Sequence, residues 1–158
     1  MKLIYIACGV ITLGILSITI YFHQSSSPQQ VISMLKPANK SVVESGQSIY
    51  VQNCASCHGV NLEGQANWRS PLANGTMPAP PHDETGHTWH HSDNYLFMMT
   101  KYGIEKTIGR SYPNNMPAYE DQLSDQDIIA VLSYIKSQWS ESIQRQHDQI
   151  NARASEYN

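Results

Sequence analysis

The chain has 158 residues, a net charge of −3 and only 15% charged residues, so it lacks the basic excess of a nucleic-acid-binding protein. Its length predicts one domain with some additional sequence. Three cysteines, two of them a close pair, exclude a disulfide-rich scaffold, in which several bridges would be spread along the chain.

The first 23 residues predict a membrane anchor. Residues 3–22 carry no charged side chain, and as a helix they would span about 30 Å, the thickness of the hydrocarbon core of a bilayer. Lys2 precedes this run, which places the N-terminus in the cytoplasm and the rest of the chain outside. A cleaved signal sequence and a lipidated Cys8 are the alternatives. The length of the run and its Tyr-Phe-His ending favour a retained single-pass helix.

Composition divides the remainder into three parts. Residues 24–41 are rich in serine, proline and glutamine, which predicts a polar linker, although the short apolar segment 31–35 could instead pack on the domain that follows. Residues 42–140 predict that domain. Residues 141–158 predict a polar helical tail with only a thin apolar stripe, which we expect to fray and to carry no chemistry.

Three segments of the domain predict helices, and no strand or repeat is visible, so the expected fold class is all-α. The first helix ends near the cysteine pair. Its predicted buried stripe consists of Val43, Gly46, Ile49 and Tyr50. The second follows Ser92 as N-cap and stops at Gly103. The third starts at Ser124, which forms a capping box with Asp127, and continues with apolar residues at helical spacing as far as Trp139.

Cys54, Cys57 and His58 form a Cys-x-x-Cys-His motif, the attachment signal of a c-type haem. Each thiol can add across one vinyl group of the porphyrin, and the adjacent imidazole then becomes the proximal ligand of the iron. A redox-active dithiol would follow a strand in a βαβ unit, and a structural zinc ion would need a second pair of ligands. The motif therefore predicts one covalently attached haem c, which is loaded outside the cytoplasmic membrane, where the anchor would place the domain.

The segments GQSIYVQNCASCHG and NNMPAYEDQLSDQDIIAVLSYIKSQW resemble the small monohaem bacterial cytochromes of the class I cytochrome c family. The resemblance covers residues 42–139. It implies a few helices wrapped around one haem, with the first and last helices crossing. Gly46 and Tyr50 on the first helix would then meet Tyr134 on the last, because glycine permits a close approach.

A second iron ligand is expected among the methionines. Met98 and Met99 lie on the predicted second helix, where packing is the expected role, whereas Met77 and Met116 stand in loops directly before a proline. Met116 resembles the ligand methionine of the family, and Pro117 stiffens the backbone beside it. The resemblance implies Met116 as the second axial ligand, with Met77 or a histidine as alternatives. An iron with protein ligands on both faces of the haem has no open position for a substrate, which predicts electron transfer and not catalysis at the iron.

A histidine-rich loop precedes the second helix. Its chemistry-bearing side chains are His82, His87, Trp89, His90 and His91. One interpretation is a second metal site, for instance copper held by imidazoles. The interpretation that we favour is contact of one or two of these side chains with the haem propionates or the helix cap, with the others in solvent.

Together these features predict a membrane-tethered electron carrier of a respiratory or periplasmic chain, not itself an enzyme. It would take single electrons from one redox protein and pass them to another, with its domain on the extracytoplasmic side of the cell membrane. The alternatives are a cytochrome subunit of a dehydrogenase or oxidase complex, and a metal-handling module that uses the histidine loop. Arg69 is the only Lys or Arg between residues 54 and 93, so this region lacks a lysine cluster that would steer it to an acidic partner.

Overall fold

The computed structural model describes residues 33–156. The predicted anchor, residues 1–23, lies outside the described residues and stays a prediction, as does the part of the predicted linker before residue 33. Between residues 33 and 156, no helix is long and apolar enough to cross a membrane.

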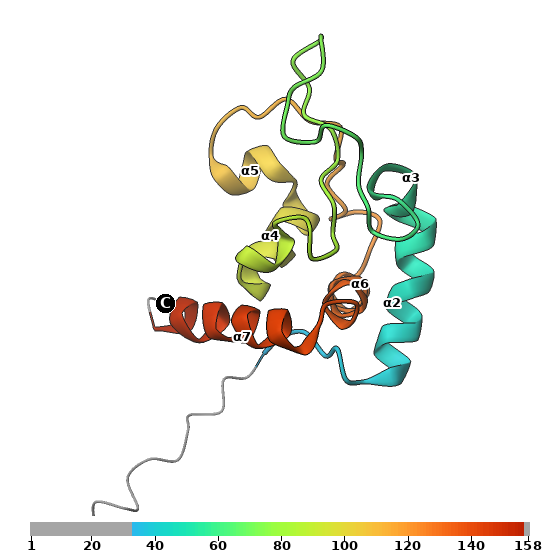
Figure 1. The fold of residues 1–158 in the computed structure, drawn as a ribbon, viewed down its shortest axis with the longest axis vertical. Helices are drawn as coiled ribbons and strands as arrows, with labels where there is room; N and C mark the ends of the chain where they lie inside the picture. The colour runs from blue at the N-terminus through green and yellow to red at the C-terminus, as the bar shows by residue number, and fades with distance from the viewer. Residues whose placement is uncertain (1–32, 157–158) are drawn as a thin grey trace, which may run out of the picture. The chain divides into compact units, whose positions relative to one another are not determined.

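The described residues form helices joined by long loops, without a strand, which confirms the predicted all-α class (Figure 1). In chain order the elements are α2 (Lys40–Asn53), α3 (Ala55–His58), the 3₁₀ turn η1 (Thr88–His90), α4 (Asp93–Tyr102), α5 (Ile104–Ile108), α6 (Asp125–Ser137) and α7 (Glu141–Ser155). The isolated bridge in this part of the chain is a parallel one between Met77 and Asn114, which joins two loops.

The helix starts follow the capping residues in the sequence. Ser92 accepts a hydrogen bond from the backbone N–H of Tyr95 at 3.4 Å and caps α4. Ser124 and Asp127 form the reciprocal capping box of α6, which satisfies two backbone donors that a helix otherwise leaves free. Gly103 ends α4 with a φ of 84°, in the region that favours glycine. The caps predicted for both helices are thereby confirmed.

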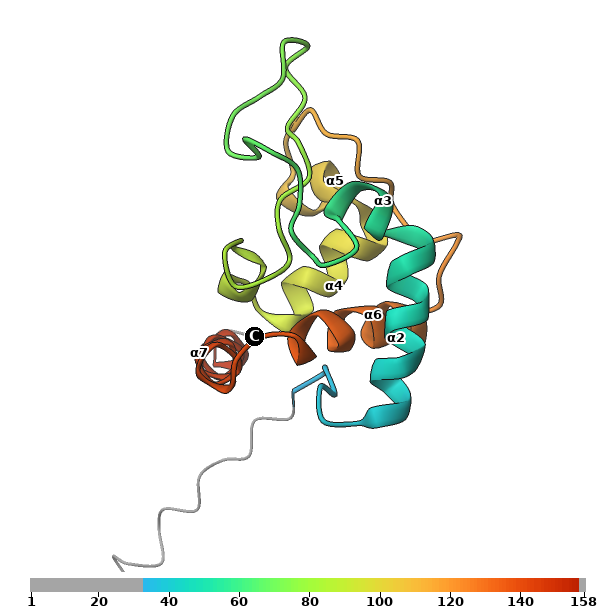
Figure 2. The same ribbon diagram turned by 45° about the vertical axis from the view of Figure 1, so that its right-hand side comes forward.

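The core is built on the crossing of α2 and α6, which lie against each other in both views (Figures 1 and 2). A Cβ atom on Gly46 would collide with the carbonyl oxygen of Ala130 and would lie 2.9 Å from Cβ of Tyr134. Tyr50 is fully buried, and its ring centroid is 5.5 Å from that of Tyr134. The crossing and its three contact residues, implied by the family resemblance, are confirmed. Met98, expected to pack, is instead 36% exposed.

The apolar segment before α2 packs on the domain and does not extend away from it. Leu35 is 3% exposed and belongs to the core. The backbone N–H of Leu35 and the hydroxyl of Ser33 both donate to Oδ2 of Asp93, at 3.0 and 2.8 Å, and the N–H of Lys36 donates to Oγ of Ser133 at 2.9 Å. For residues 33–36 the structure therefore shows the packed alternative.

Helix α7 is held by buried polar side chains, so the expectation of a fraying tail is wrong for Glu141–Ser155. His147 is fully buried, and its Nε2 donates to the carbonyl oxygen of His91 at 2.8 Å. Asn151 exchanges two hydrogen bonds with Asp93, at 2.7 and 2.8 Å. Figure 2 shows α7 nearly end-on, beside the start of α4. Hydrophobic periodicity gives no signal for these residues because the buried positions of α7 are polar.

We expect His147 to make the domain less stable below pH 6.5. Burial, with nearby Lys136, lowers the pKa of His147 in the folded protein from its ordinary value of 6.5, with Asp93, the His91 carbonyl and Asp148 opposing in part. The unfolded chain then binds a proton that the folded protein does not, so the free energy of unfolding falls as the pH drops from 6.5 towards the folded pKa. The buried Nδ1 has no hydrogen-bond partner among the described residues, so a proton there would stay unpaired.

Denaturant unfolding above and below pH 6.5 checks this expectation. His147→Gln keeps a donor for the His91 carbonyl but does not titrate, so its stability should depend less on pH than that of the unsubstituted protein. His90→Gln, on an exposed residue, is the control and should leave the pH dependence unchanged. An equal pH dependence in His147→Gln and the unsubstituted protein would contradict the assignment.

Candidate functional site

The Cys-x-x-Cys-His motif forms a helical turn directly after α2. The N–H of Cys54 donates to the carbonyl of Tyr50 at 2.8 Å, and the N–H of His58 donates to the carbonyl of Cys54 at 2.9 Å. Both cysteines are free thiols, and Cys57 is exposed. Burial, with a smaller effect of Cys57, raises the pKa of the Cys54 thiol to about 11. The attacking thiol of a redox-active dithiol has a lowered pKa, a property that Cys54 lacks.

His58 is oriented as a metal ligand needs to be. The side chain is 8% exposed, and its Nδ1 lies 2.8 Å from the carbonyl oxygen of Pro80. A carbonyl only accepts, so Nδ1 carries the proton and Nε2 presents a lone pair. Burial lowers the pKa of His58 from its ordinary value, with the Pro80 carbonyl opposing, which favours the neutral ring. The chemistry of this side chain therefore fits the proximal position of a haem iron.

The position of Pro80 depends on a glycine that the sequence alone did not single out. Gly64 has a φ of 68°, and a Cβ atom there would lie 2.6 Å from the carbonyl carbon of Pro80. The N–H of Gly64 donates to the carbonyl of His58 at 2.8 Å. Gly64 and Pro80 therefore both bond to His58 through their backbone groups. Proline and glycine composition indicates a loop here without showing what the loop contacts.

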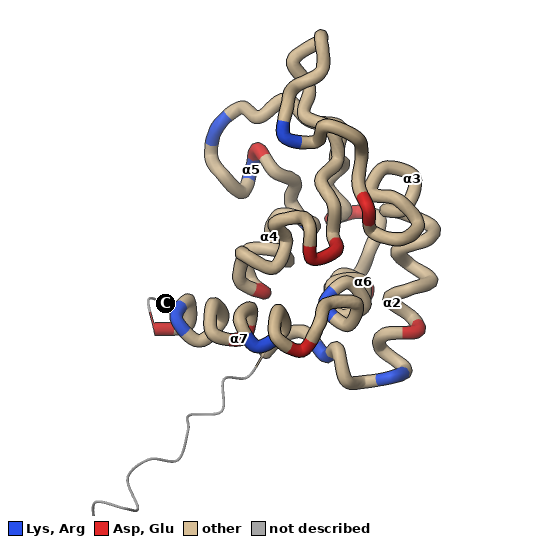
Figure 3. The backbone as a smooth tube through the Cα atoms, in the orientation of Figure 1, with Lys and Arg blue, Asp and Glu red and all other residues tan. Residues whose placement is uncertain are grey.

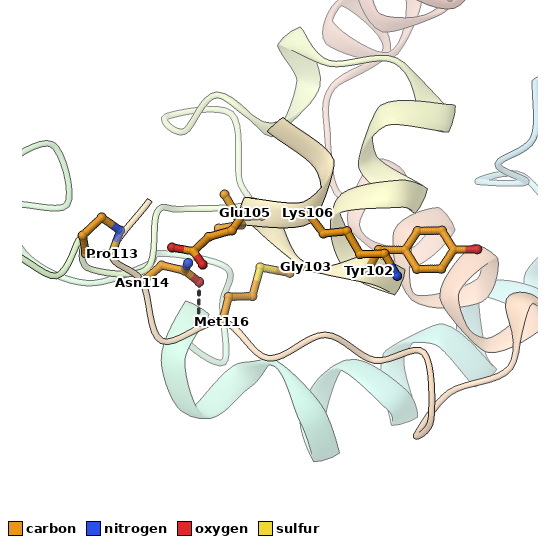
Figure 4. Close-up of a pocket in the computed structure, with 8 residues that line it drawn as sticks. Tyr102, Gly103, Glu105, Lys106, Pro113, Asn114 and Met116 are labelled. Carbon is orange, nitrogen blue, oxygen red and sulfur yellow. Dashed lines mark hydrogen bonds between the residues drawn. The ribbon is translucent and has the colours of Figure 1, made fainter. Parts of the chain in front are cut away.

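Met116 lines a cavity of about 440 Å³ between the loop that precedes α6 and the start of α5 (Figure 4). The other lining residues are Tyr102, Gly103, Ile104, Glu105, Lys106, Pro113 and Asn114. The N–H of Met116 donates to Oδ1 of Asn114 at 2.9 Å. Cys54, Cys57 and His58 do not line this cavity. The sequence reading identified Met116 but none of the other lining residues, since they share no motif.

Tyr119 links the Met116 loop to the cysteine motif. Its hydroxyl donates to the carbonyl of Asn53, the residue before Cys54, at 2.8 Å. Burial raises the pKa of Tyr119 to about 12, with smaller contributions from Cys54 and Cys57. The loop that carries Met116 is therefore anchored three residues further on, beside the predicted haem-attachment turn.

The two methionines considered as distal ligands lie on neighbouring loops. The N–H of Met77 donates to the carbonyl of Pro113 at 3.0 Å, next to the bridge with Asn114. Both side chains are half-buried, but only Met116 lines the cavity. Because no residue of the Cys-x-x-Cys-His motif lines that cavity, the choice of Met116 over Met77 as iron ligand stays a prediction.

The histidine loop does not gather its imidazoles into one site. Each ring stacks on a different partner: His82 on His58 at 3.9 Å, His87 on Trp68 at 5.3 Å, His90 on Trp89 at 3.6 Å, and His91 on Tyr95 at 4.7 Å. Within residues 33–156, no three His, Cys, Asp or Glu side chains are placed to hold a metal ion. The arrangement therefore does not support the second metal site considered from the sequence. Contact with haem propionates stays a prediction.

Within residues 33–156, the charged side chains near the motif include no lysine cluster, and the carboxylate of Glu63 lies beside Gly59. Helix α3 carries none of the charged types in Figure 3. The guanidinium of Arg69 lies 4.1 Å from the ring centroid of Trp68, and Asp93 is buried. Lys106, which lines the cavity, lies 3.5 Å from Glu120. Among the described residues, the cavity lining therefore contains one lysine, which is paired with Glu120, and no lysine cluster.

Comparison with known proteins identifies the class of protein. The Cytochrome c family matches residues 43–139, more than half of the chain, so the chain belongs to this family. Membership implies covalently bound haem c and a role in electron transfer, which confirms the predicted family at that level. Helix α7 lies beyond the matched residues.

Two kinds of relative are similar to the chain. It is 29% identical over 108 residues to the Cbb3-type cytochrome c oxidase subunit CcoP of Azospirillum brasilense. The aligned residues make up 68% of this chain and 32% of that protein. It is also 33% identical over 100 residues to cytochrome c-552 of Thermus thermophilus. Those residues make up 61% of this chain and 70% of that protein. The chain spans about a third of the length of the CcoP relatives. No solved structure matches it at a significant level.

Proposed function

We propose that the chain is a monohaem electron carrier of the class I type, in which Cys54 and Cys57 bind haem c through thioether bonds and His58 and Met116 ligate its iron. The observation that carries the proposal is the hydrogen bond from Nδ1 of His58 to Pro80. It leaves Nε2 as the ligand atom, directly after the two thiols. Bound haem c would supply the one-electron exchange between ferric and ferrous iron.

The two side chains proposed as iron ligands favour electron transfer over catalysis. With haem bound, the imidazole of His58 and the thioether of Met116 would leave no open position for oxygen, peroxide or another substrate, which favours electron transfer over catalysis. A thioether opposite an imidazole also raises the reduction potential relative to two imidazoles. The domain itself would then be no enzyme.

The membrane tether is part of the same proposal. Residues 3–22 are uncharged and long enough to span a bilayer, with the domain on the extracytoplasmic side. Because residues 33–36 bond to the domain, the linker in this proposal comprises residues 24–32. Recovery of the full-length chain in the membrane fraction, and release of a chain beginning at residue 24, is the expected result.

A second function has its own support. The likeness to the oxidase subunit CcoP favours a role as the cytochrome subunit of an oxidase complex, with its electron donor or acceptor bound stably. Co-purification from detergent-solubilised membranes separates the two functions. A stoichiometric partner supports the subunit, whereas a haem protein recovered alone supports the shuttle.

Covalent attachment is the first test of the haem site. With haem-attachment machinery present, the unsubstituted chain should keep its haem in a denaturing gel, because thioether bonds survive unfolding. The Cys54→Ala/Cys57→Ala variant should lose it. Cys8→Ala removes the remaining cysteine and should keep the haem. An unsubstituted chain without covalent haem would contradict the proposal. A redox titration should then follow a one-electron curve.

A further inference from the structure

The ring of His82 lies almost flat against the ring of His58. The two centroids are 3.9 Å apart, and the ring planes differ by 21°. Among the described residues, His82 is the only aromatic ring recorded in contact with His58. The hydrogen bond to Pro80 restrains one edge of the His58 ring, at Nδ1, but hydrogen bonds tolerate some misalignment, so a limited rotation of the ring remains. A flat neighbour restricts that rotation.

His82 is itself rigidly held along its backbone. Its N–H donates to the carbonyl of Leu62 at 2.8 Å, and its carbonyl accepts from Nε1 of Trp139 at 2.8 Å. Trp139 is 3% exposed and Leu62 is 5% exposed, so both partners belong to the core. Pro81 precedes it and fixes its own φ. The stacked ring is therefore carried by backbone that the core holds in place.

The side chain of His82 has a defined orientation as well. Its Nδ1 lies 2.8 Å from Oγ1 of Thr88, and the Thr88 hydroxyl donates to the carbonyl of Pro81 at 3.4 Å. The hydroxyl oxygen then accepts from His82, so Nδ1 of His82 carries the proton. This bond fixes which way the imidazole plane turns. Thr88 is 6% exposed, so solvent does not compete strongly for the bond.

We propose that His82 is a positioning residue that sets the plane of the His58 ring and thereby the orientation of the axial imidazole at the iron. The inference rests on the proposed function, since it takes His58 as the ligand. Outer-shell contacts commonly fix the ring orientation of a ligating histidine. Here the segment 80–82 supplies two such contacts, a carbonyl at the edge of the ring and an aromatic face against its plane.

The alternative is that His82 only fills space in the core. Two substitutions separate the two roles. His82→Phe keeps a flat ring but loses the bond to Thr88, whereas His82→Leu fills much of the volume without a flat face. A positioning role predicts that the phenylalanine variant resembles the unsubstituted protein more closely than the leucine variant does.

The test uses the haem-loaded full chain in its ferric state, with haem-methyl proton NMR shifts and electron paramagnetic resonance g values as readouts. Both depend on the orientation of the axial imidazole plane. We expect His82→Leu to change the order or spacing of the haem-methyl resonances and His82→Phe to stay close to the unsubstituted pattern. Gln149→Leu, at an exposed position of α7, should leave both readouts unchanged.

Unchanged haem-methyl shifts and g values in His82→Leu overturn the proposal. If that variant does not accumulate, His82→Gln, which has no ring, is measured against His82→Phe, and equal spectra for these two overturn it as well. A failure of the proposed function is distinguishable, because the unsubstituted protein would then show no covalent haem or no sulfur-to-iron absorption band. An unsubstituted protein with both features and unaltered ringless variants refutes only the positioning role.

Discussion

Replacing Met116 with alanine is expected to leave the haem covalently attached and to lower its reduction potential sharply. The thioether stabilises ferrous iron relative to ferric iron, and its loss opens the distal position to water or another ligand. Axial ligands tune haem potentials over roughly 0.8 V, so we expect a fall on the order of 0.1 V or more. Two measurements check this: the weak far-red sulfur-to-iron band should vanish from the oxidised spectrum, and a redox titration should give the lower potential.

Met77→Ala is the matched control for Met116→Ala. Its loop is bridged to the Met116 loop through Asn114, and it also precedes a proline, but it does not line the cavity. The control should keep the far-red band and nearly the same potential. The reverse pattern, with the band lost only in Met77→Ala, would move the distal ligand to Met77. A band absent from the unsubstituted protein itself would point to a histidine or an open site.

Gly46→Ala is expected to destabilise the folded domain by about 2 kcal/mol. The added methyl group would collide with the carbonyl oxygen of Ala130 and press on Tyr134, so α2 and α6 would have to move apart. Overpacking of a core contact costs up to about 3 kcal/mol, and the better helix propensity of alanine offsets about 1 kcal/mol of this. Guanidinium unfolding of the haem-loaded protein measures the difference.

Ser45→Ala provides the control for this substitution. Ser45 is the preceding residue of α2 and is exposed, so its replacement should change the free energy of unfolding by no more than about 0.5 kcal/mol. A Gly46→Ala protein as stable as Ser45→Ala would show that α6 can move away from α2 at little cost. The close approach at Gly46 would then not be a determinant of stability.

Local patterns predicted a large part of the fold. The capping residues Ser92 and Ser124 were readable because a cap and its helix are neighbours in sequence. The crossing of α2 and α6 at Gly46 came from the family resemblance. Apolar spacing identified the buried face of α6, and Ile128 is indeed fully buried. The Cys-x-x-Cys-His motif was equally local, since five consecutive positions define it.

Contacts across long sequence separations could not be predicted in this way. His147 donates a hydrogen bond to the carbonyl of His91, 56 positions earlier in the chain. Asp93 accepts a hydrogen bond from Ser33, 60 positions before it. These buried groups are polar, so hydrophobic periodicity gives no signal for them. The packed segment before α2 was therefore left as one of two alternatives, and the firm attachment of α7 was not expected.

The sequence by itself determined that this chain carries a Cys-x-x-Cys-His motif within an all-α domain, because spacing, capping and periodicity act over a few residues. Only the tertiary structure decided what surrounds that motif. It brought Pro80 to Nδ1 of His58, stacked His82 on the same ring, and stacked His87 and His91 on Trp68 and Tyr95. The physical reason is that side chains more than twenty positions apart meet only when the core of α2 and α6 fixes the loops between them.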